Sequence, residues 1–244
     1  MFPGIGTVLN ISTIIIGSMI GILIGAKLSE KLRNLIVDVL GCVTAISAAD
    51  ALSAYWDPTL TKALPDGGAI LVIIFSLLLG ALIGTWLKIE EGLEKLGKKL
   101  KDRFSPQGGS NFVEGFVSAS LIFAIGPLAI LGSISDGMGT GIDQLVLKST
   151  LDGFTSIAFA ASLGWGVALS SLPVGIYQFF WTAVGLLLGA ILAPYQIAAM
   201  TAVGGVLLIG IALRLLKIRE IAVANLLPAL ALAPLLALFA HQLI

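Results

Sequence analysis

Lys148 and Asp152 are the residues of this sequence best suited to chemistry, because both stand in a long apolar stretch. A spacing of four places the two side chains on one face of a helix. A lone carboxylate in lipid is costly, and an ammonium group one turn away offsets that cost. The spacing therefore predicts an ion pair inside the membrane. The pair either exchanges its partner for a substrate or a proton, or holds helices in register.

A Gly126-Pro127 pair falls within the apolar segment 111–132. Proline removes one backbone hydrogen bond of a helix and leaves a carbonyl group without its partner. In lipid that carbonyl needs a protein group, a water molecule or an ion, so the pair predicts either a simple kink or a ligand. A second glycine-rich break, at 164–166, follows the segment 144–163. Two interrupted neighbouring helices would place helix ends near one site, where helix dipoles favour ions.

Other polar residues could complete such a site. Asn10 and Asn225 lie in the first and last apolar segments, where an asparagine either joins two helices or binds a ligand. Gln178 offers another neutral oxygen from a third segment. Asp136 is either a turn residue or helix N-cap, or a cation ligand together with Asp143 on the extracytoplasmic side.

The composition excludes most other classes of protein. Of the 244 residues, 57% are hydrophobic and only 11% are charged, whereas soluble domains carry about 25% charge. The net charge is zero, which gives no case for a nucleic-acid partner. With one cysteine and with His241, next to the C-terminus, as the one histidine, neither a His/Cys metal cage nor a Ser-His-Asp triad is expected. We therefore expect no enzyme and no cofactor, while the identity of any bound metal stays open.

The apolar segments are long enough to cross a membrane as helices, for which about 20 residues are needed. Eight such segments are present: 5–26, 34–55, 69–87, 111–132, 144–163, 171–193, 196–215 and 220–243. Twelve of the 14 lysines and arginines fall in the odd-numbered gaps between them or, for Arg214, at the segment end that borders such a gap. That side of the membrane is predicted to be cytoplasmic, and both chain termini are then extracytoplasmic.

The expected fold class is all-α, a polytopic transmembrane bundle of about eight helices in which the fourth and fifth helices are broken. The whole chain, 1–244, is predicted to form a single transmembrane domain. Its one long hydrophilic gap, 88–110, carries acid–base pairs at helical spacing. That gap predicts a cytoplasmic amphipathic helix, which either continues the third helix or lies on the membrane surface.

Glycines suggest an internal repeat. Two sets share the same spacing, Gly21, Gly25 and Gly41 in one and Gly185, Gly189 and Gly205 in the other. They fall in segments that run in opposite directions, so they predict an inverted repeat of helices 1–3 and 6–8, an architecture of secondary transporters. The alternative is that glycine is simply frequent in membrane helices. Small-residue faces at 17–25, 80–84 and 185–189 further predict a homodimer.

Four runs of the sequence resemble a known family. They read GTVLN at 6–10, GPLAILGSISDG at 126–137, LKSTLDGFTSIAFAASLGWGV at 147–167 and NLLPALALA at 225–233. They look like the YdfK/YqgA-like bacterial inner-membrane proteins, a domain of unknown function, and the likeness covers nearly the whole chain. The resemblance implies a multi-pass protein of the bacterial inner membrane with no established substrate. It adds Ser149 to the candidate positions.

These observations predict a small secondary transporter or ion-coupled carrier of an unknown small solute or ion. Asp152 would bind a cation or proton, and Lys148 would be its internal counter-ion. Asn10 and Asn225 would be neutral ligands, and the proline break would supply carbonyl groups. The site would then lie between the first, fourth, fifth and eighth helices. The alternatives are a non-transporting sensor or scaffold that acts through 88–110, and a channel with a continuous polar pore.

Overall fold

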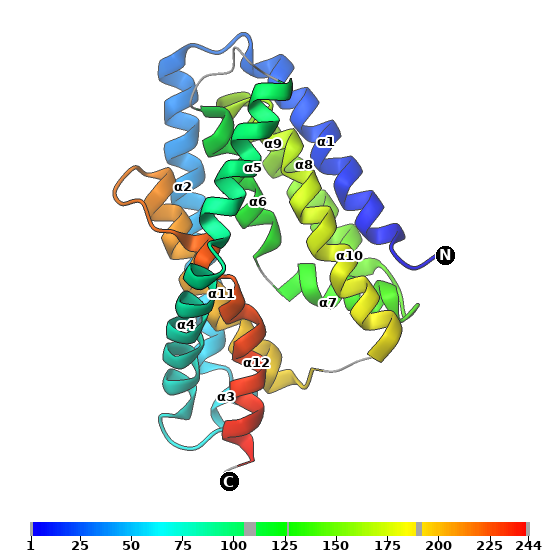
Figure 1. Ribbon diagram of the computed structural model, residues 1–244, viewed down its shortest axis with the longest axis vertical. Helices are drawn as coiled ribbons and strands as arrows, with labels where there is room; N and C mark the ends of the chain where they lie inside the picture. Colours follow the sequence, from blue (N-terminus) through cyan, green and yellow to red (C-terminus); the bar gives the residue numbers. More distant parts are fainter. Residues whose placement is uncertain (1, 105–110, 126, 189–191, 243–244) are drawn as a thin grey trace. The chain divides into compact units, whose positions relative to one another are not determined.

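The chain folds into helices joined by short turns (Figure 1). The computed structural model describes residues 2–104, 111–125, 127–188 and 192–242. Its contacts cluster into two compact units, each assembled from segments that are distant in the sequence. Unit 1 comprises Met1–Leu40, Leu93–Ala124 and Leu128–Ala190, and unit 2 comprises Gly41–Gly92, Ile125–Pro127 and Ile191–Ile244.

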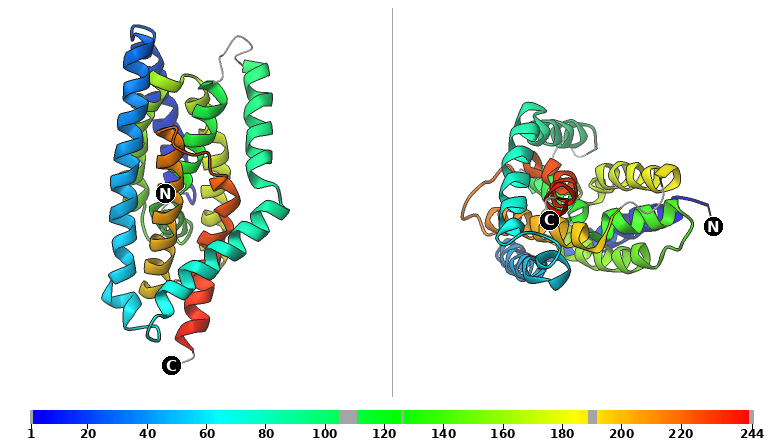
Figure 2. Two further views of the ribbon diagram at one scale, coloured as in Figure 1. Left: turned by 90° about the vertical axis from the view of Figure 1, so that its left-hand side faces the viewer. Right: turned by 90° about the horizontal axis from the view of Figure 1, so that it is seen from below.

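Unit 1 contains most of the helices. They are α1 (Ile5–Gly25), the first part of α2 (Glu30–Leu52), most of α5 (Ile89–Phe104), α6 (Asn111–Ala124), α7 (Pro127–Gly137) from Leu128 on, α8 (Asp143–Leu163), α9 (Gly166–Leu169) and α10 (Ser171–Leu188). Figure 1 shows α1 beside α8 and α10, and both neighbours contact α1. Helix α2 is continuous and contributes its later residues to unit 2 (Figure 2).

The contact between α1 and α8 is a seam of small residues. Three glycines of α1 lie against carbonyl oxygens of α8, with Gly17 opposite Gly153, Gly21 opposite Ile157 and Gly25 opposite Ala161. A methyl group at any of these glycines would overlap a carbonyl oxygen, so the two backbones approach as closely as a membrane bundle allows. The residue numbers of the contacts increase together along both helices, so α1 and α8 run parallel.

Two breaks shape the rest of unit 1. Helix α6 and the segment from Leu128 to Gly137 meet at a bend of 63°, so the predicted fourth helix is interrupted where the sequence has its proline. The fifth predicted helix is different, because α8 runs unbroken to Leu163 and ends at Gly164, whose φ is 78°. The glycine-rich break thus ends α8 and connects it to α9, rather than interrupting a helix inside the membrane.

Unit 2 is built around a second close contact. Its elements are the later part of α2, η1 (Ser53–Trp56), α3 (Pro58–Thr61), α4 (Gly68–Trp86), α11 (Pro194–Leu215), η2 (Val223–Leu226) and α12 (Pro228–His241). Gly80 of α4 lies against Ala229, and Gly84 lies against the backbone of Asn225. These contacts run in opposite senses along the chain, so α4 and α12 are antiparallel.

Helix lengths and composition identify a membrane protein. Among the residues that the structure describes, six helical stretches are long and apolar enough to span a membrane, and the bent α6–α7 pair would make a seventh. Helix α8 has 21 residues, which is about 31 Å of helix, but it carries Asp143, Lys148 and Asp152. Counting α8 gives the eight crossings that were predicted, and this number stays a prediction.

The amphipathic gap and the glycine faces also find their places. Residues Ile89–Phe104 form α5, a separate helix that begins after Lys88, whose φ is 53°. The remainder of the gap, 105–110, lies outside the described residues. The small-residue faces expected to mediate a dimer are used inside the chain where they are described: 17–25 packs on α8, Gly80 and Gly84 pack on unit 2 segments, and Gly185 packs on α7. Gly189, the end of the third face, lies outside the described residues. A homodimer would therefore need other surfaces.

Candidate functional site

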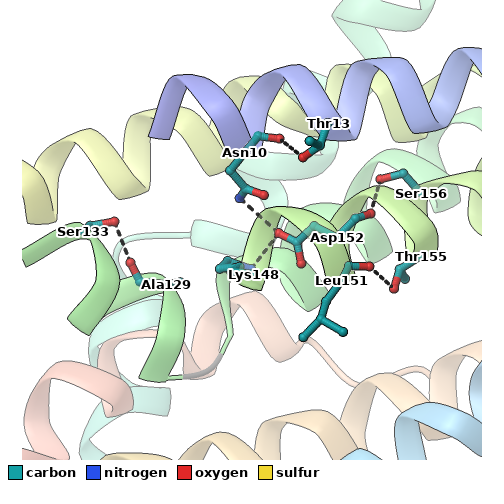
Figure 3. Close-up of polar contacts among 9 residues, drawn as sticks. All are labelled: Asn10, Thr13, Ala129, Ser133, Lys148, Leu151, Asp152, Thr155 and Ser156. Atoms are coloured by element: carbon teal, nitrogen blue, oxygen red, sulfur yellow. Dashed lines mark hydrogen bonds and ion pairs between the residues drawn. The ribbon is translucent and has the colours of Figure 1, made fainter. Parts of the chain in front are cut away.

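Asp152 is the centre of a buried polar cluster in unit 1 (Figure 3). Its Oδ2 accepts a hydrogen bond from Lys148 Nζ at 2.7 Å and another from Asn10 Nδ2 at 3.0 Å. Asn10 is fully buried, Lys148 is 5% exposed and Asp152 is 7% exposed. The ion pair expected from the spacing of four is present, and the structure adds an amide from a helix 142 residues away in sequence.

The seam between α1 and α8 positions these three side chains. Asn10 stands two turns before Gly17 on α1, and Asp152 directly precedes Gly153 on α8. Thr13, one turn after Asn10, lies against Gly153, so the short amide of Asn10 reaches the Asp152 carboxylate. Figure 3 shows Asn10 and Lys148 pointing toward that carboxylate from α1 and α8. The tight packing thus delivers a neutral and a charged donor to the same oxygen.

Several polar atoms near this cluster have no hydrogen-bond partner among the described residues. Asn10 uses its Nδ2 but not its Oδ1, and the Ser149 hydroxyl has no partner although the residue is 1% exposed. The Thr7 hydroxyl, one turn before Asn10, is buried and unpartnered as well. Buried polar groups in native proteins are normally hydrogen-bonded. Carbonyl and hydroxyl oxygens in this state are suited to a ligand, an ion or ordered water.

Gln178 belongs to the same unit but is not bonded to the cluster. It lies on α10, is fully buried, and neither atom of its amide has a partner among the described residues. Gly175 of α10 lies against Ile11, and Phe179 lies against Gly4. These contacts place Gln178 at the level of the first turns of α1. It remains a candidate ligand on a neighbouring helix.

Asp136 has a defined structural role. Its Oδ2 accepts a hydrogen bond from the backbone N–H of Gly6 at 2.9 Å, and Asp136 is 3% exposed. Because α1 begins at Ile5, the carboxylate satisfies a free N–H of the first turn and lies at the positive end of the helix dipole. The contact corresponds to the capping alternative, across 130 residues. Asp143 is exposed at the start of α8.

The break of the fourth predicted helix can be described only in part. Gly126 lies outside the described residues, and Pro127 is the first residue of α7. Proline is favourable at the first position of a helix, where its missing N–H has no intrahelical partner. The proline therefore begins a new helix after the break instead of kinking a continuous one.

Asn225 serves unit 2, so the expectation that it shares a site with Asn10 does not agree with its contacts. Its Oδ1 accepts a hydrogen bond from the backbone N–H of Glu90 at 2.9 Å. Since Glu90 is in the first turn of α5, Asn225 caps that helix from η2. An asparagine in this position is a structural contact between segments.

The sequence analysis did not predict the ion pair that Glu90, the residue capped by Asn225, forms with Arg214. Glu90 Oε1 accepts a bond from Arg214 Nη1 at 2.6 Å, and its Oε2 accepts one from the backbone N–H of Ala224 at 2.8 Å. The side chains of Glu90 and Arg214 are only 10% and 13% exposed. The sequence contained a sign of this ion pair, because Arg214 falls inside the apolar segment 196–215. Glu90 and Arg214 also both lie at the predicted cytoplasmic ends of their helices.

Comparison with known proteins places the chain in a family. The family described as "Protein of unknown function (DUF554)" matches residues 5–238. The chain belongs to the DUF554 family. It is 30% identical over 241 residues to the "Uncharacterized protein YqgA" of Escherichia coli (strain K12), covering 94% of each chain. It is 28% identical over 236 residues to the "Uncharacterized membrane protein YdfK" of Bacillus subtilis (strain 168), covering 97% of this chain and 96% of that one.

This membership confirms the resemblance found in the four sequence runs. The name of the Bacillus relative agrees with the apolar helices of the structure in indicating a membrane protein. No solved structure matches the chain. Neither relative's name states an activity, so an argument about function of this DUF554 protein depends on its own side chains.

Proposed function

We propose that this DUF554 protein is a small secondary transporter, or ion-coupled carrier, of a small solute or ion across the bacterial inner membrane. The observation that carries the proposal is the buried Asp152 carboxylate. Among the described residues it is bonded only to side chains, and polar atoms of Asn10 and Ser149 near it have no partner there. Ionisable groups at membrane depth are expensive and are typically kept for function. Asp152 is the binding group for a cation or proton, and Lys148 is its internal counter-ion.

The geometry of the pair argues against a purely structural role. Lys148 and Asp152 lie on the same helix, so their bond adds no link between helices. Among the described residues, the one hydrogen bond that joins this pair to another helix is that of Asn10 on α1, and the glycine seam already sets the register of α1 and α8. A membrane protein that needed register alone could use apolar side chains at lower cost, because buried ion pairs are often no better than hydrophobic replacements.

A broken helix in the same unit supports a carrier. The bend of 63° between α6 and the rest of α7 interrupts the backbone hydrogen bonds of a membrane-length segment. Irregular backbone at membrane depth is tolerated where it lines a cavity or a binding site, and broken helices recur at the ion sites of secondary transporters. Ser149 and Gln178, whose buried polar atoms have no partner among the described residues, are proposed to contribute to the site with Asp152.

The packing directions support the inverted repeat, an architecture of many secondary transporters. In an inverted repeat of helices 1–3 and 6–8, each helix runs antiparallel to its counterpart. Gly175 against Ile11 and Phe179 against Gly4 make α10 antiparallel to α1. The α4–α12 contact is antiparallel as well. The third pair is α2 with α11, where Gly41 lies against Leu216 and Gly205 lies against Leu52. These contacts make the two helices antiparallel. Gly41 and Gly205 are also equivalent positions in the predicted repeat.

The orientation follows the positive-inside rule, with both termini outside and α5 in the cytoplasm. A homodimer stays part of the proposal, although it needs surfaces other than the three glycine faces. Accessibility of introduced cysteines at residues 3 and 66, on a background in which Cys42 is replaced by serine, tests the orientation. Labelling at both positions from the cytoplasmic side would contradict it.

The function is tested by ligand-dependent thermal stability. Purified protein in detergent is melted with a panel of ions and small metabolites, in the wild type, in Asp152→Asn and in Asp143→Asn. A ligand of the native state raises the melting temperature by mass action. We expect at least one compound to stabilise the wild type and Asp143→Asn but not Asp152→Asn, followed by uptake of that compound into proteoliposomes.

The opposite result favours a sensor or scaffold. If no compound shifts the melting temperature, and Asp152→Asn only destabilises the protein, the pair is structural. Function would then depend on the exposed face of α5, and charge reversal of Lys98 and Lys99 would abolish it. A channel would instead have a continuous polar pore rather than one occluded site. It would then give ion currents that do not saturate as a single binding site fills.

A further inference from the structure

The surface of unit 1 has a groove between α1, α5, α9 and α10. Its volume is about 430 Å³, and its walls are apolar side chains that include Ile11, Leu100, Phe104, Leu169, Ile176 and Phe179. We propose that this groove binds one acyl chain of an anionic phospholipid, and that Lys99 and Arg103 bind the phosphate of the same molecule. The lipid site goes beyond the transport function and does not depend on it, because none of these residues belongs to the Asp152 cluster.

The walls of the groove suit a hydrocarbon chain. Ser171 is the one polar side chain among the described residues that line it, and its hydroxyl already donates a hydrogen bond to the carbonyl of Ala168 at 2.7 Å. Ile176 and Phe179 are exposed, although they stand in a helical stretch that is long and apolar enough to span a membrane. The surroundings of such side chains are lipid tails, which are as apolar as leucine.

The groove is about as long as one leaflet of a bilayer. Its lining on α9 and α10 extends from Leu169 to Phe179, and ten residues of helix rise about 15 Å. The hydrocarbon core of a bilayer is about 30 Å thick, so the groove matches a chain from one leaflet. It begins near the start of the candidate span Gly166–Leu187, which is the predicted cytoplasmic end. The lipid therefore belongs to the cytoplasmic leaflet.

A positive charge stands at the edge of the groove. The guanidinium carbon of Arg103 lies 5.7 Å from the centre of the Phe104 ring, and Phe104 lines the groove. Lys99 is four residues before Arg103, so the two side chains share one face of α5. Two neighbouring cations next to an apolar groove match a phosphate that is attached to a hydrocarbon chain.

These two basic side chains are available to a ligand. Both are exposed, and among the described residues neither Lys99 nor Arg103 takes part in an ion pair. Lys98, by contrast, lies 3.9 Å from the carboxylate of Glu94. The last seven residues of α5 include four basic residues and one acidic residue. This end of α5 therefore keeps a positive charge, and basic groups at the cytoplasmic surface attract anionic lipids.

The two cations also select among headgroups. Arginine binds a phosphate through two parallel N–H donors, and lysine adds a compact point charge. A choline headgroup carries its own cation, which competes with Lys99 and Arg103 for the phosphate. A glycerol headgroup has no such cation, so phosphatidylglycerol has the chemistry that this site fits.

The test begins with delipidated protein in a neutral detergent. Its melting temperature is titrated with phosphatidylglycerol, with phosphatidylcholine that has the same chains, and with glycerol phosphate, which has a headgroup and no chain. A ligand of the native state raises the melting temperature by mass action. We expect phosphatidylglycerol to bind more tightly than phosphatidylcholine, and salt to reduce that difference by screening the charges. Glycerol phosphate should have no effect.

Two sets of variants separate the headgroup from the chain. Lys99→Gln with Arg103→Gln should weaken phosphatidylglycerol binding about thirtyfold. The matched control is Lys27→Gln with Lys31→Gln, which removes two exposed lysines on the same predicted side of the membrane. Lipid retention in native mass spectrometry provides a second measurement.

A tryptophan placed in the groove tests the site of the chain. Ile176→Trp fills part of the groove and should weaken the binding of both phospholipids. Leu187→Trp is its control, because Leu187 is exposed on the same helix and does not line the groove. If Ile176→Trp binds lipid as the control does, the chain does not lie in this groove and the inference is wrong.

The remaining outcomes separate the lipid site from the proposed transporter. Equal affinity for the two phospholipids, or unchanged phosphatidylglycerol binding without Lys99 and Arg103, would overturn the anionic site. Stabilisation by glycerol phosphate would point to a soluble anion and would overturn it too. The response of Asp152 to its own ligand is measured in the same variants and should persist in all of them. A lipid result of either kind therefore leaves the transport proposal to its own test.

Discussion

Units 1 and 2 each contain a buried ion pair with an asparagine, and the two clusters are bonded differently. In unit 2, Glu90 binds a side chain on α11 and a backbone N–H in η2, and its own backbone N–H binds Asn225. Three segments are tied together. In unit 1, Lys148 and Asp152 belong to one helix and only Asn10 joins them to another. A charge that binds several segments is part of the scaffold, whereas one that binds its own helix is free to change partner.

The hydrogen bonding of the two carboxylates, Glu90 and Asp152, also distinguishes a structural cluster from a binding cluster. Both carboxylate oxygens of Glu90 accept a hydrogen bond. Both bonds to Asp152 converge on Oδ2, and unpartnered atoms lie beside it on Asn10 and Ser149. A fully bonded polar network rigidifies a protein, whereas buried polar atoms without protein partners are suited to a ligand, an ion or ordered water. The comparison predicts that the two clusters respond differently to the same kinds of mutation.

The largest effect is expected for Arg214→Met. Removing one partner of a buried ion pair leaves an uncompensated charge, which costs about 3–5 kcal/mol. We expect a large fall in the melting temperature in detergent, while the protein that remains folded still responds to ligand. Arg219→Met, an exposed arginine nearby, is the control. If Arg214→Met is as stable as that control but no longer responds to ligand, the roles of the two clusters are reversed.

Removing both charges of a pair sharpens the comparison. Lys148→Met with Asp152→Asn should change stability by no more than about 1 kcal/mol, because neutral replacement of a buried ion pair is often tolerated, yet it should abolish transport. Glu90→Leu with Arg214→Met should cost about 1–3 kcal/mol, since the N–H of Ala224 is left unpaired. Melting and uptake are measured on both double variants. Equal losses of stability would mean that both pairs are structural.

The two asparagines should differ in a smaller but specific way. Asn225→Ala removes a helix cap and should cost about 1 kcal/mol without changing the affinity for ligand. Asn10→Ala removes one interhelical bond, which averages about 0.6 kcal/mol in a membrane, but it should weaken ligand binding about tenfold, or about 1.4 kcal/mol. Ligand titrations followed by melting distinguish the two. A loss of affinity in Asn225→Ala would place that residue in the site after all.

The smallest effect is expected for Asp143→Asn. Its carboxylate is exposed at the start of α8, and surface substitutions usually change stability by less than about 0.5 kcal/mol. Both the melting temperature and the ligand response should stay at wild-type values. A lost response would restore the alternative in which Asp143 binds a cation, and would extend the site beyond the buried cluster.

Local patterns were enough to predict much of this protein. The membrane class follows from the apolar segments, and some helices begin and end within a few residues of those expected, as α1 at 5–25 and α4 at 68–86 do. The last segment, predicted as 220–243, differs, because α12 begins only at Pro228. The Lys148–Asp152 pair was predictable because a spacing of four acts within one helix. The proline break was predictable because it is a property of the backbone at Pro127.

Contacts between distant segments were not predictable in this way. Asp136 was read as a turn residue or an N-cap, but only the fold places it 130 residues away from its partner, on Gly6. The same holds for Glu90 and Arg214, which are 124 residues apart. Asn10 and Asn225 looked equivalent, and their partners made one a neighbour of Asp152 and the other a helix cap.

The sequence by itself thus determined the solvent of this protein, its helices and the charge pair that one helix carries, because hydrophobic length and helical spacing are local properties. The tertiary structure decided which polar groups contact one another and which glycine faces pack against other helices of the same chain. The stripe at 17–25 looks the same for a dimer contact as for an internal seam. It becomes internal because α8 presents its own backbone carbonyls there, and that close approach brings Asn10 to Asp152.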